Sequence, residues 1–126
     1  MDSKKVIDEL KRKYPGKKII KNGEDNPSEI LCEVDPSTNH PEYSLAVAVI
    51  DKSLPHSHKK TTETYKVTKG KLALFIDNKR HELKEGEELI IKPGWVHWAK
   101  GNEIWVECYS EPGWTFEDHI LEEVSN

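Results

Sequence analysis

From Glu42 onward, the sequence consists of short β-like runs separated by turn residues, at intervals of about eight to twelve residues. The runs are YSLAVAVID, TETYKVT, KLALFID, KRHEL, EELIIK, WVHWAK and EIWVECYS. The turn signals between them include Lys69-Gly70, Asp77-Asn78, Pro93-Gly94 and Gly101-Asn102. No helical pattern alternates with these runs, as a parallel sheet would require. The spacing therefore predicts an all-β domain, built as an antiparallel sandwich or barrel.

A short helix is expected before this β-rich part, over about residues 4–13. Ser3 is a candidate N-cap, and three apolar side chains share one helical face: Val6, Ile7 and Leu10. Because that face is narrow, we expect the helix to dock on another element rather than stand alone. The expected division is a helix and arm over residues 1–30, a barrel over 31–110, and a tail over 111–126 that packs on the barrel or a partner subunit.

The length and charge of the chain restrict its function. A chain of 126 residues suits one domain, and a net charge of −4 without a basic stripe argues against a nucleic-acid partner. The longest apolar run, Leu45–Ile50, is too short for a membrane span, and the first residues lack the apolar stretch of a secretory signal. We therefore expect a cytoplasmic protein without a membrane partner. Cys32 and Cys108 are expected to be free buried thiols, although the sequence leaves a disulfide open.

The segment HSHKKTTE contains three candidate metal ligands, His56, His58 and Glu63. In extended backbone, residues i and i+2 face the same side, so the two histidines can converge. In TETYKVT, alternation places Glu63 on the same inner face as Tyr65 and Val67. An acid on a core face is costly unless it is paired or bound to a cation. The pattern therefore predicts that Glu63 meets the two histidines at a metal site.

His97, in PGWVHWA, is the fourth candidate ligand. If this run is a strand, His97 shares a face with Trp95 and Ala99. The other histidines lie in a loop, a charged hairpin and the C-terminal tail, and are expected to be solvated or locally hydrogen-bonded: His40, His81 and His119.

These residues resemble the cupin family. In its first motif, His-x-His is followed by a glutamate and then, after six intervening residues, by a glycine, as in His56, His58, Glu63 and Gly70. The second motif matches from Gly86 through Pro93-Gly94 to His97. The departures are Ile50 at the first glycine, Lys92 where proline is usual, and Asn102 one residue late. The resemblance implies a jelly-roll β-barrel holding a divalent metal through three His and one Glu.

A set of three imidazoles and one carboxylate suits Mn, Fe, Ni, Co or Zn. An octahedral ion would keep two positions open for water or substrate, as catalytic sites do. Tyr65 and Trp95 are expected to line the substrate pocket near the metal, although aromatic residues at such positions often only pack.

The leading hypothesis is a metal-dependent enzyme acting on a small molecule such as a sugar or sugar phosphate, in the manner of an isomerase. Two alternatives stay open: an Fe- or Mn-dependent dioxygenase, and a non-catalytic small-molecule-binding module. No further acid or base stands out in the sequence, which keeps the binding module open. A homodimer is expected, because Leu45–Ile50 is apolar on both faces and small cupins are often dimeric.

Overall fold

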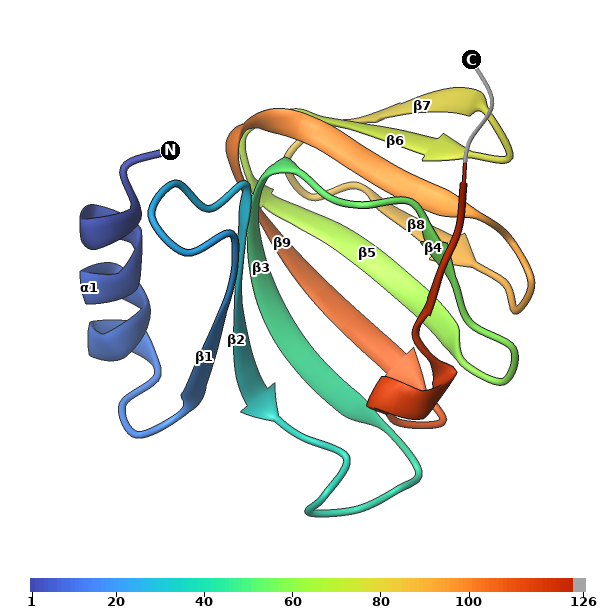
Figure 1. Ribbon diagram of the computed structural model, residues 1–126, viewed down its shortest axis with the longest axis horizontal. Coiled ribbons are helices and arrows are strands. Elements are labelled where there is room, and N and C mark those ends of the chain that lie inside the picture. The colour runs from blue at the N-terminus through green and yellow to red at the C-terminus, as the bar shows by residue number, and fades with distance from the viewer. Residues whose placement is uncertain (124–126) are drawn as a thin grey trace.

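The computed structural model describes residues 1–123 as an antiparallel β-barrel with one helix on its outer side (Figure 1). In chain order, the elements are α1 (Ser3–Lys13), β1 (Lys18–Asn22), β2 (Glu29–Asp35), β3 (Ser44–Lys52), β4 (His56–Ser57), β5 (Thr62–Lys69), β6 (Leu72–Ile76), β7 (Lys79–Leu83), β8 (Glu88–Ile91), β9 (His97–Glu111), the 3-10 turn η1 (Phe116–Asp118) and β10 (Ile120–Leu121). All strand pairings are antiparallel. The predicted all-β jelly-roll barrel with a short N-terminal helix is confirmed. The described residues contain no helix long and apolar enough to cross a membrane.

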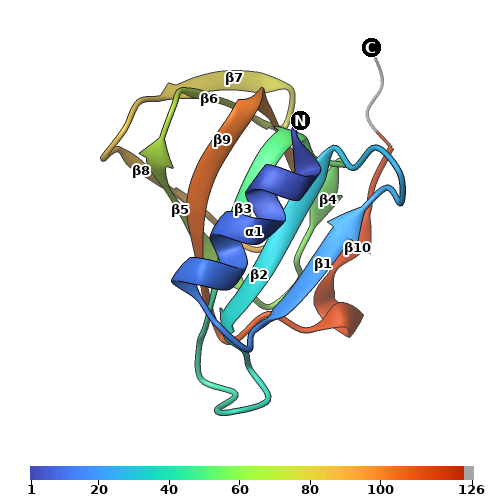
Figure 2. The same cartoon turned by 90° about the vertical axis from the view of Figure 1, so that its left-hand side faces the viewer.

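Helix α1 covers the outer face of β2 and β3 (Figure 2). It begins one residue earlier than predicted, because the carboxylate of Asp2, rather than the hydroxyl of Ser3, accepts a hydrogen bond from the amide of Lys5. An acidic N-cap also stabilises the positive end of the helix dipole. The buried side chains of Val6 and Leu10 pack on an outer core formed by Ile30, Cys32, Val47, Val49 and Trp105.

Two strands precede Glu42, where the sequence showed no clear β rhythm. β1 and β2 are short and carry many charged residues, and they add to the sheet in the order β1-β2-β3-β9. The sheet therefore begins inside the segment 1–30 that was assigned to the arm. At the other end, residues 124–126 of the predicted tail lie outside the described residues.

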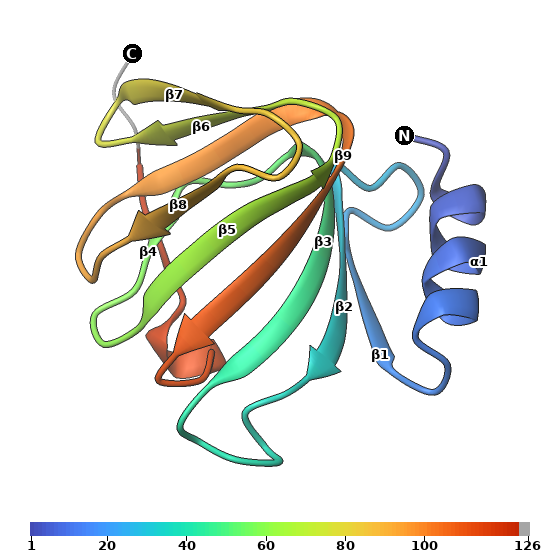
Figure 3. The same cartoon turned by 180° about the vertical axis from the view of Figure 1, so that it is seen from behind.

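Strand β9 runs unbroken through a point where two strands were expected. Residues 101–103 stand opposite the single residue Asp51, because Lys100 pairs with Lys52 and Ile104 pairs with Ile50. A Cβ on Gly101 would lie 2.3 Å from Ile104 Cγ1, so this bend requires glycine. Before the bend β9 pairs with β4, β6 and the last residue of β3, and after it with the rest of β3 and with β5 (Figure 3). One bent strand thus belongs to both halves of the barrel.

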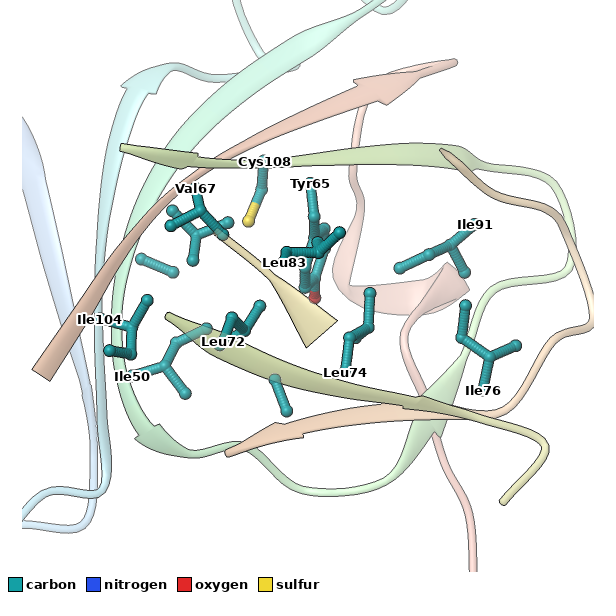
Figure 4. Packing of buried hydrophobic residues seen from close by; sticks show 13 residues of the cluster. Ile50, Tyr65, Val67, Leu72, Leu74, Ile76, Leu83, Ile91, Ile104 and Cys108 are labelled. Atoms are coloured by element: carbon teal, nitrogen blue, oxygen red, sulfur yellow. The ribbon is translucent and has the colours of Figure 1, made fainter. Parts of the chain in front are cut away.

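The barrel interior is filled by side chains that alternate along the strands (Figure 4). In β5, Glu63, Tyr65 and Val67 are buried, as the alternation in TETYKVT predicted. The interior cluster comprises Ala48, Ile50, Tyr65, Val67, Leu72, Leu74, Ile76, Leu83, Ile91, Ala99, Ile104, Val106 and Cys108. Two members of this cluster, Ile91 and Ile76, are the strand partners of Glu63 and His97, so these two polar residues border the apolar interior.

Strand β3 is apolar on both faces because it lies between two cores. Ala48 and Ile50 face the barrel interior, whereas Val47 and Val49 face α1. β3 is also an inner strand, between β2 and β9, so the apolar face of Leu45–Ile50 is covered within the chain. This removes one premise of the expected homodimer, which itself stays a prediction.

The two cysteines lie in different layers. Cys32 belongs to the outer core beneath α1, and Cys108 belongs to the barrel interior. Both thiols are free and buried, as expected, and they form no disulfide.

Candidate metal centre

Four side chains from separate parts of the chain converge inside one end of the barrel. His56 lies in β4, His58 just after it, Glu63 in β5, and His97 at the start of β9. In the sheet, His56 is the direct partner of His97. All four residues are buried, and one ligand atom from each lies within 4.8 Å of all the others. The structure therefore brings together the four residues that the sequence analysis proposed.

The three imidazole rings are held in the same way, each by its Nδ1. His56 Nδ1 lies 2.8 Å from the carbonyl oxygen of Leu54, and His97 Nδ1 lies 3.0 Å from that of Trp95. His58 Nδ1 lies 3.1 Å from the carbonyl oxygen of Asp118. A carbonyl oxygen only accepts, so each Nδ1 carries the proton. Each ring can then use Nε2 as a metal ligand, and its orientation is fixed from behind.

The carboxylate of Glu63 lies between two of these rings. Its Oε1 is 2.9 Å from His58 Nε2 and 3.1 Å from His97 Nε2. Ser110 donates to Oε2 at 3.5 Å from the facing position in β9. His58 Nε2 is fully buried, and its angle to Glu63 does not meet that of a hydrogen bond, so it has no aligned partner within residues 1–123. An orphaned ring nitrogen facing a carboxylate is the environment that a bound cation satisfies.

The charges of this cluster are strongly coupled. Burial alone would raise the pKa of Glu63, but His58 and His97 lower it below its ordinary range, so the carboxylate is ionised. Burial opposes a charge on His58, yet the neighbouring Glu63 raises the pKa of this ring above its ordinary value. Burial, followed by the proximity of His97, lowers the pKa of His56 to about 3, so this ring is neutral.

The donor set fits a divalent transition metal. Three imidazole nitrogens and one carboxylate oxygen are a mixed set that accepts Mn, Fe, Ni, Co or Zn, and the donors alone do not choose among these ions. The spacing of at most 4.8 Å allows all four donors to reach one ion, since metal–ligand bonds to such atoms are about 2.0–2.2 Å.

The two aromatic residues expected in the pocket have different surroundings. Tyr65 is buried, and its ring meets the ring of His97 edge-on, with centroids 5.9 Å apart. Trp95 lies in the turn before β9, and its side chain is 37% exposed. What Trp95 gives the site is its backbone carbonyl, which orients His97. That either ring contacts a substrate stays a prediction.

His119 belongs to the site although it was expected to be solvated or locally hydrogen-bonded in the tail. Its ring stacks on His56 with centroids 4.5 Å apart and lies 5.6 Å from His58. Its Nδ1 is buried without a hydrogen-bond partner among the described residues. The expectation is wrong because the tail folds back along β4. His40, by contrast, is locally hydrogen-bonded, to Asp35.

A second buried carboxyl group, Glu29, also faces the barrel interior. It lies at the start of β2 on the same side as Leu31, which packs against the interior cluster. Asn22 Nδ2 donates to its Oε1 at 2.7 Å. Burial raises the pKa of Glu29 to about 7, and the charge of Glu63 adds to this rise. Glu29 falls in the segment 1–30 that was assigned to the helix and arm, and no local pattern marked it as functional.

Comparison with known proteins agrees with this fold. The family model described as "Cupin domain" matches residues 45–104, the segment that contains all four candidate ligands. The protein MJ1618 of Methanocaldococcus jannaschii is 34% identical over 88 residues, which are 64% of this chain and 70% of the relative.

Two solved structures show the same fold at low sequence identity. Pac13 from Streptomyces, a nucleoside dehydratase, superposes with a TM-score of 0.75 at 9% identity over 90% of each chain. A Klebsiella pneumoniae protein with a double-stranded β-helix domain superposes with a TM-score of 0.68 at 24% identity, over 81% of this chain and 90% of that chain. These structures show the fold, and the family model and the relative show that the chain belongs to the cupin family.

Proposed function

We propose that this protein is a metal-dependent enzyme that acts on a small molecule carrying neighbouring oxygen atoms, such as a sugar. The observation that carries the proposal is the convergence of four buried donors, with every histidine held by its Nδ1 and turned to offer Nε2. Four protein donors leave two positions of an octahedral ion open, which distinguishes a catalytic site from a closed structural one. A divalent ion held there would polarise the oxygens of a bound substrate.

Proton transfer in such a site needs a further acid or base, and Glu29 is our candidate. It is buried at the start of β2, and it is close enough to Glu63 and His97 for their charges to shift its pKa. A carboxyl group with a pKa of about 7 can both give and take a proton near neutral pH. Asn22 fixes one of its oxygens, so the other is available to a ligand.

The charges around the site favour an uncharged sugar over a sugar phosphate. Among the described residues, the buried side chains include three carboxyl groups and no lysine or arginine: Glu29, Glu63 and Asp118. Phosphate groups are usually bound by arginine, lysine or a group of free amides. The amides of Lys59, Lys60 and Thr61 could form such a group, but the carboxylate of Asp118 already accepts from them.

Pac13 supports a small molecule that contains a sugar, since it is a nucleoside dehydratase whose structures include uridine. We keep the isomerase reaction as the leading version, and the dioxygenase and the non-catalytic binding module as alternatives. The cytoplasmic location and the homodimer also remain proposals.

Metal analysis followed by turnover assays tests this function. The purified protein is stripped with a chelator, reloaded separately with Mn, Fe, Ni, Co or Zn, and assayed on panels of sugars, sugar phosphates and diketones. We expect one ion per chain and turnover without oxygen uptake. Oxygen consumption coupled to turnover would support the dioxygenase instead. Bound metal and ligand without turnover would support the binding module, and a protein that takes up none of these ions would refute the proposal.

A further inference from the structure

The carboxylate of Asp118 is bound by three successive backbone amides of the loop that follows His58. Oδ1 accepts from the amide nitrogens of Lys59 at 3.0 Å and Lys60 at 3.2 Å. Oδ2 accepts from Lys60 at 3.2 Å and from Thr61 at 3.1 Å. Asp118 is buried, although it lies 55 or more residues further along the chain than this loop. Such charge-assisted bonds to a buried carboxylate are strong, and they fix the path of the loop.

The same residue also orients a candidate metal ligand. The carbonyl oxygen of Asp118 lies 3.1 Å from His58 Nδ1, which carries its proton toward this acceptor. Asp118 therefore holds the backbone between His58 and Glu63 with its side chain, and the ring of His58 with its main chain. Both candidate ligands that flank the loop depend on where this one residue sits.

Further contacts fix Asp118 in the C-terminal strap, which we define as residues 115–122. The hydroxyl of Thr115 accepts from the amide of Asp118. β10 pairs with β4, with Ile120 opposite Ser57, and the amide of Glu122 donates to the carbonyl of Pro55. The strap thus runs alongside the strand that carries His56 (Figure 1). The stack of His119 on His56 adds a side-chain contact between them.

We propose that Asp118 is a positioning residue for the metal ligands, so that docking of the strap and binding of the metal are cooperative. This inference rests on the proposed metal site. Replacing a group that orients a metal-binding histidine changes metal affinity, because the histidine then loses more conformational entropy when the metal binds. By reciprocity, a bound metal should stabilise the docked strap.

The test compares Asp118→Asn with Glu117→Gln, a matched change at the exposed neighbouring residue. Asparagine keeps the shape but places an NH2 group against amides that need an acceptor. We expect Asp118→Asn to weaken Co²⁺ binding about 10–100-fold in chelator competition. It should also alter the visible absorption of bound Co²⁺, which reports ligand geometry. Glu117→Gln should change neither quantity. Unchanged Co²⁺ affinity in a folded Asp118→Asn protein would overturn the inference.

If the variant does not fold, amide hydrogen exchange of the wild-type protein tests whether strap docking and metal binding are cooperative. Metal should slow exchange at Lys59, Lys60 and Thr61 and in the strap, and equal exchange with and without bound metal would overturn the cooperativity. If the wild-type protein binds no metal, the proposed function fails and the cooperativity fails with it. Amide exchange in the metal-free proteins then still tests the positioning role of Asp118 separately from the proposed metal site. Faster exchange at residues 59–61 in Asp118→Asn than in the wild type supports this role, and unchanged exchange refutes it.

Discussion

The ring of His119 lies stacked on the ring of His56, with centroids 4.5 Å apart and planes inclined by 28°. The two residues are separated by half the length of the chain, and the pairing of β10 with β4 brings them together. His119 therefore forms one side of the metal centre without belonging to its four donors.

Replacing His119 with phenylalanine should preserve the metal. Phenylalanine can retain the stack on His56, and the four donors stay in place, so we expect one ion per chain with an affinity within about threefold of wild type. Elemental analysis and chelator competition measure this. Loss of the ion would show instead that His119 is a fifth ligand.

Replacing His58 or His97 with alanine should remove both metal and activity. Each change deletes one of four donors, so the affinity should fall by more than the roughly 10–100-fold typical of residues that only orient a ligand. His40→Ala and His81→Ala are matched controls outside the cluster and should leave metal content unchanged. Glu63→Gln should weaken the metal while keeping the shape of the site. Metal content after purification is measured by mass spectrometry. A His58→Ala protein that retained its metal would contradict this assignment.

Metal uptake should release a proton when the pH lies below the pKa of His58. Burial opposes a charge on this ring, but the Glu63 carboxylate raises its pKa above the ordinary value, so below that pKa the metal must displace a proton from Nε2. Affinity should then fall about tenfold for each pH unit below the pKa of His58. Calorimetry in two buffers of different ionisation enthalpy counts the released protons. The Glu63→Gln protein, in which the pKa of His58 should be lower, should release fewer.

Glu29 should make the metal-free protein less stable as pH rises. Burial raises its pKa from 4.5 to about 7, so the folded state binds this proton more tightly than the unfolded chain does. The resulting contribution, about 3 kcal/mol, is present below pH 4.5 and is lost as pH rises to about 7. His56 acts in the opposite direction, because its lowered pKa gives stability that is lost as pH falls below its ordinary value.

Comparison with Glu29→Gln isolates this effect, since the contribution of His56 is common to both proteins. Urea unfolding between pH 4.5 and 7.5 should show the wild type losing stability relative to Glu29→Gln by up to about 3 kcal/mol. A constant difference across this range would mean that Glu29 does not titrate as described. In the loaded enzyme, Glu29→Gln should lower kcat about 100-fold or more if Glu29 transfers the proton.

The sequence predicted the barrel and its four candidate ligands because both depend on local patterns. Alternation along one strand is enough to turn Glu63 inward with Tyr65, and the spacing of His56 and His58 needs only extended backbone. β1 and β2 were missed because their residues are stabilised by pairing and by α1, and not by a strong β-forming composition.

The contributions of Asp118, His119 and Glu29 could not be read from the sequence for a related reason. Asp118 and His119 act on residues about 60 positions earlier, through a strap whose path depends on the finished barrel. Glu29 becomes an interior group only because β2 pairs with β3. The split predicted at Gly101-Asn102 also failed, because glycine there permits a bend within a strand as readily as a turn between strands.

The bend in β9 has a consequence for how this site can change. His97 begins the strand, and Ser110, which donates to Glu63, stands one residue before its end. One continuous segment therefore both supplies a donor and supports another, and the curvature at residues 101–103 sets the separation between them. We therefore expect substitutions at residues 102 and 103 to change the separation between His97 and Ser110, and with it the fit of a bound ion, while every candidate ligand stays the same. The choice of ion would then depend on backbone shape at a place remote from the ion.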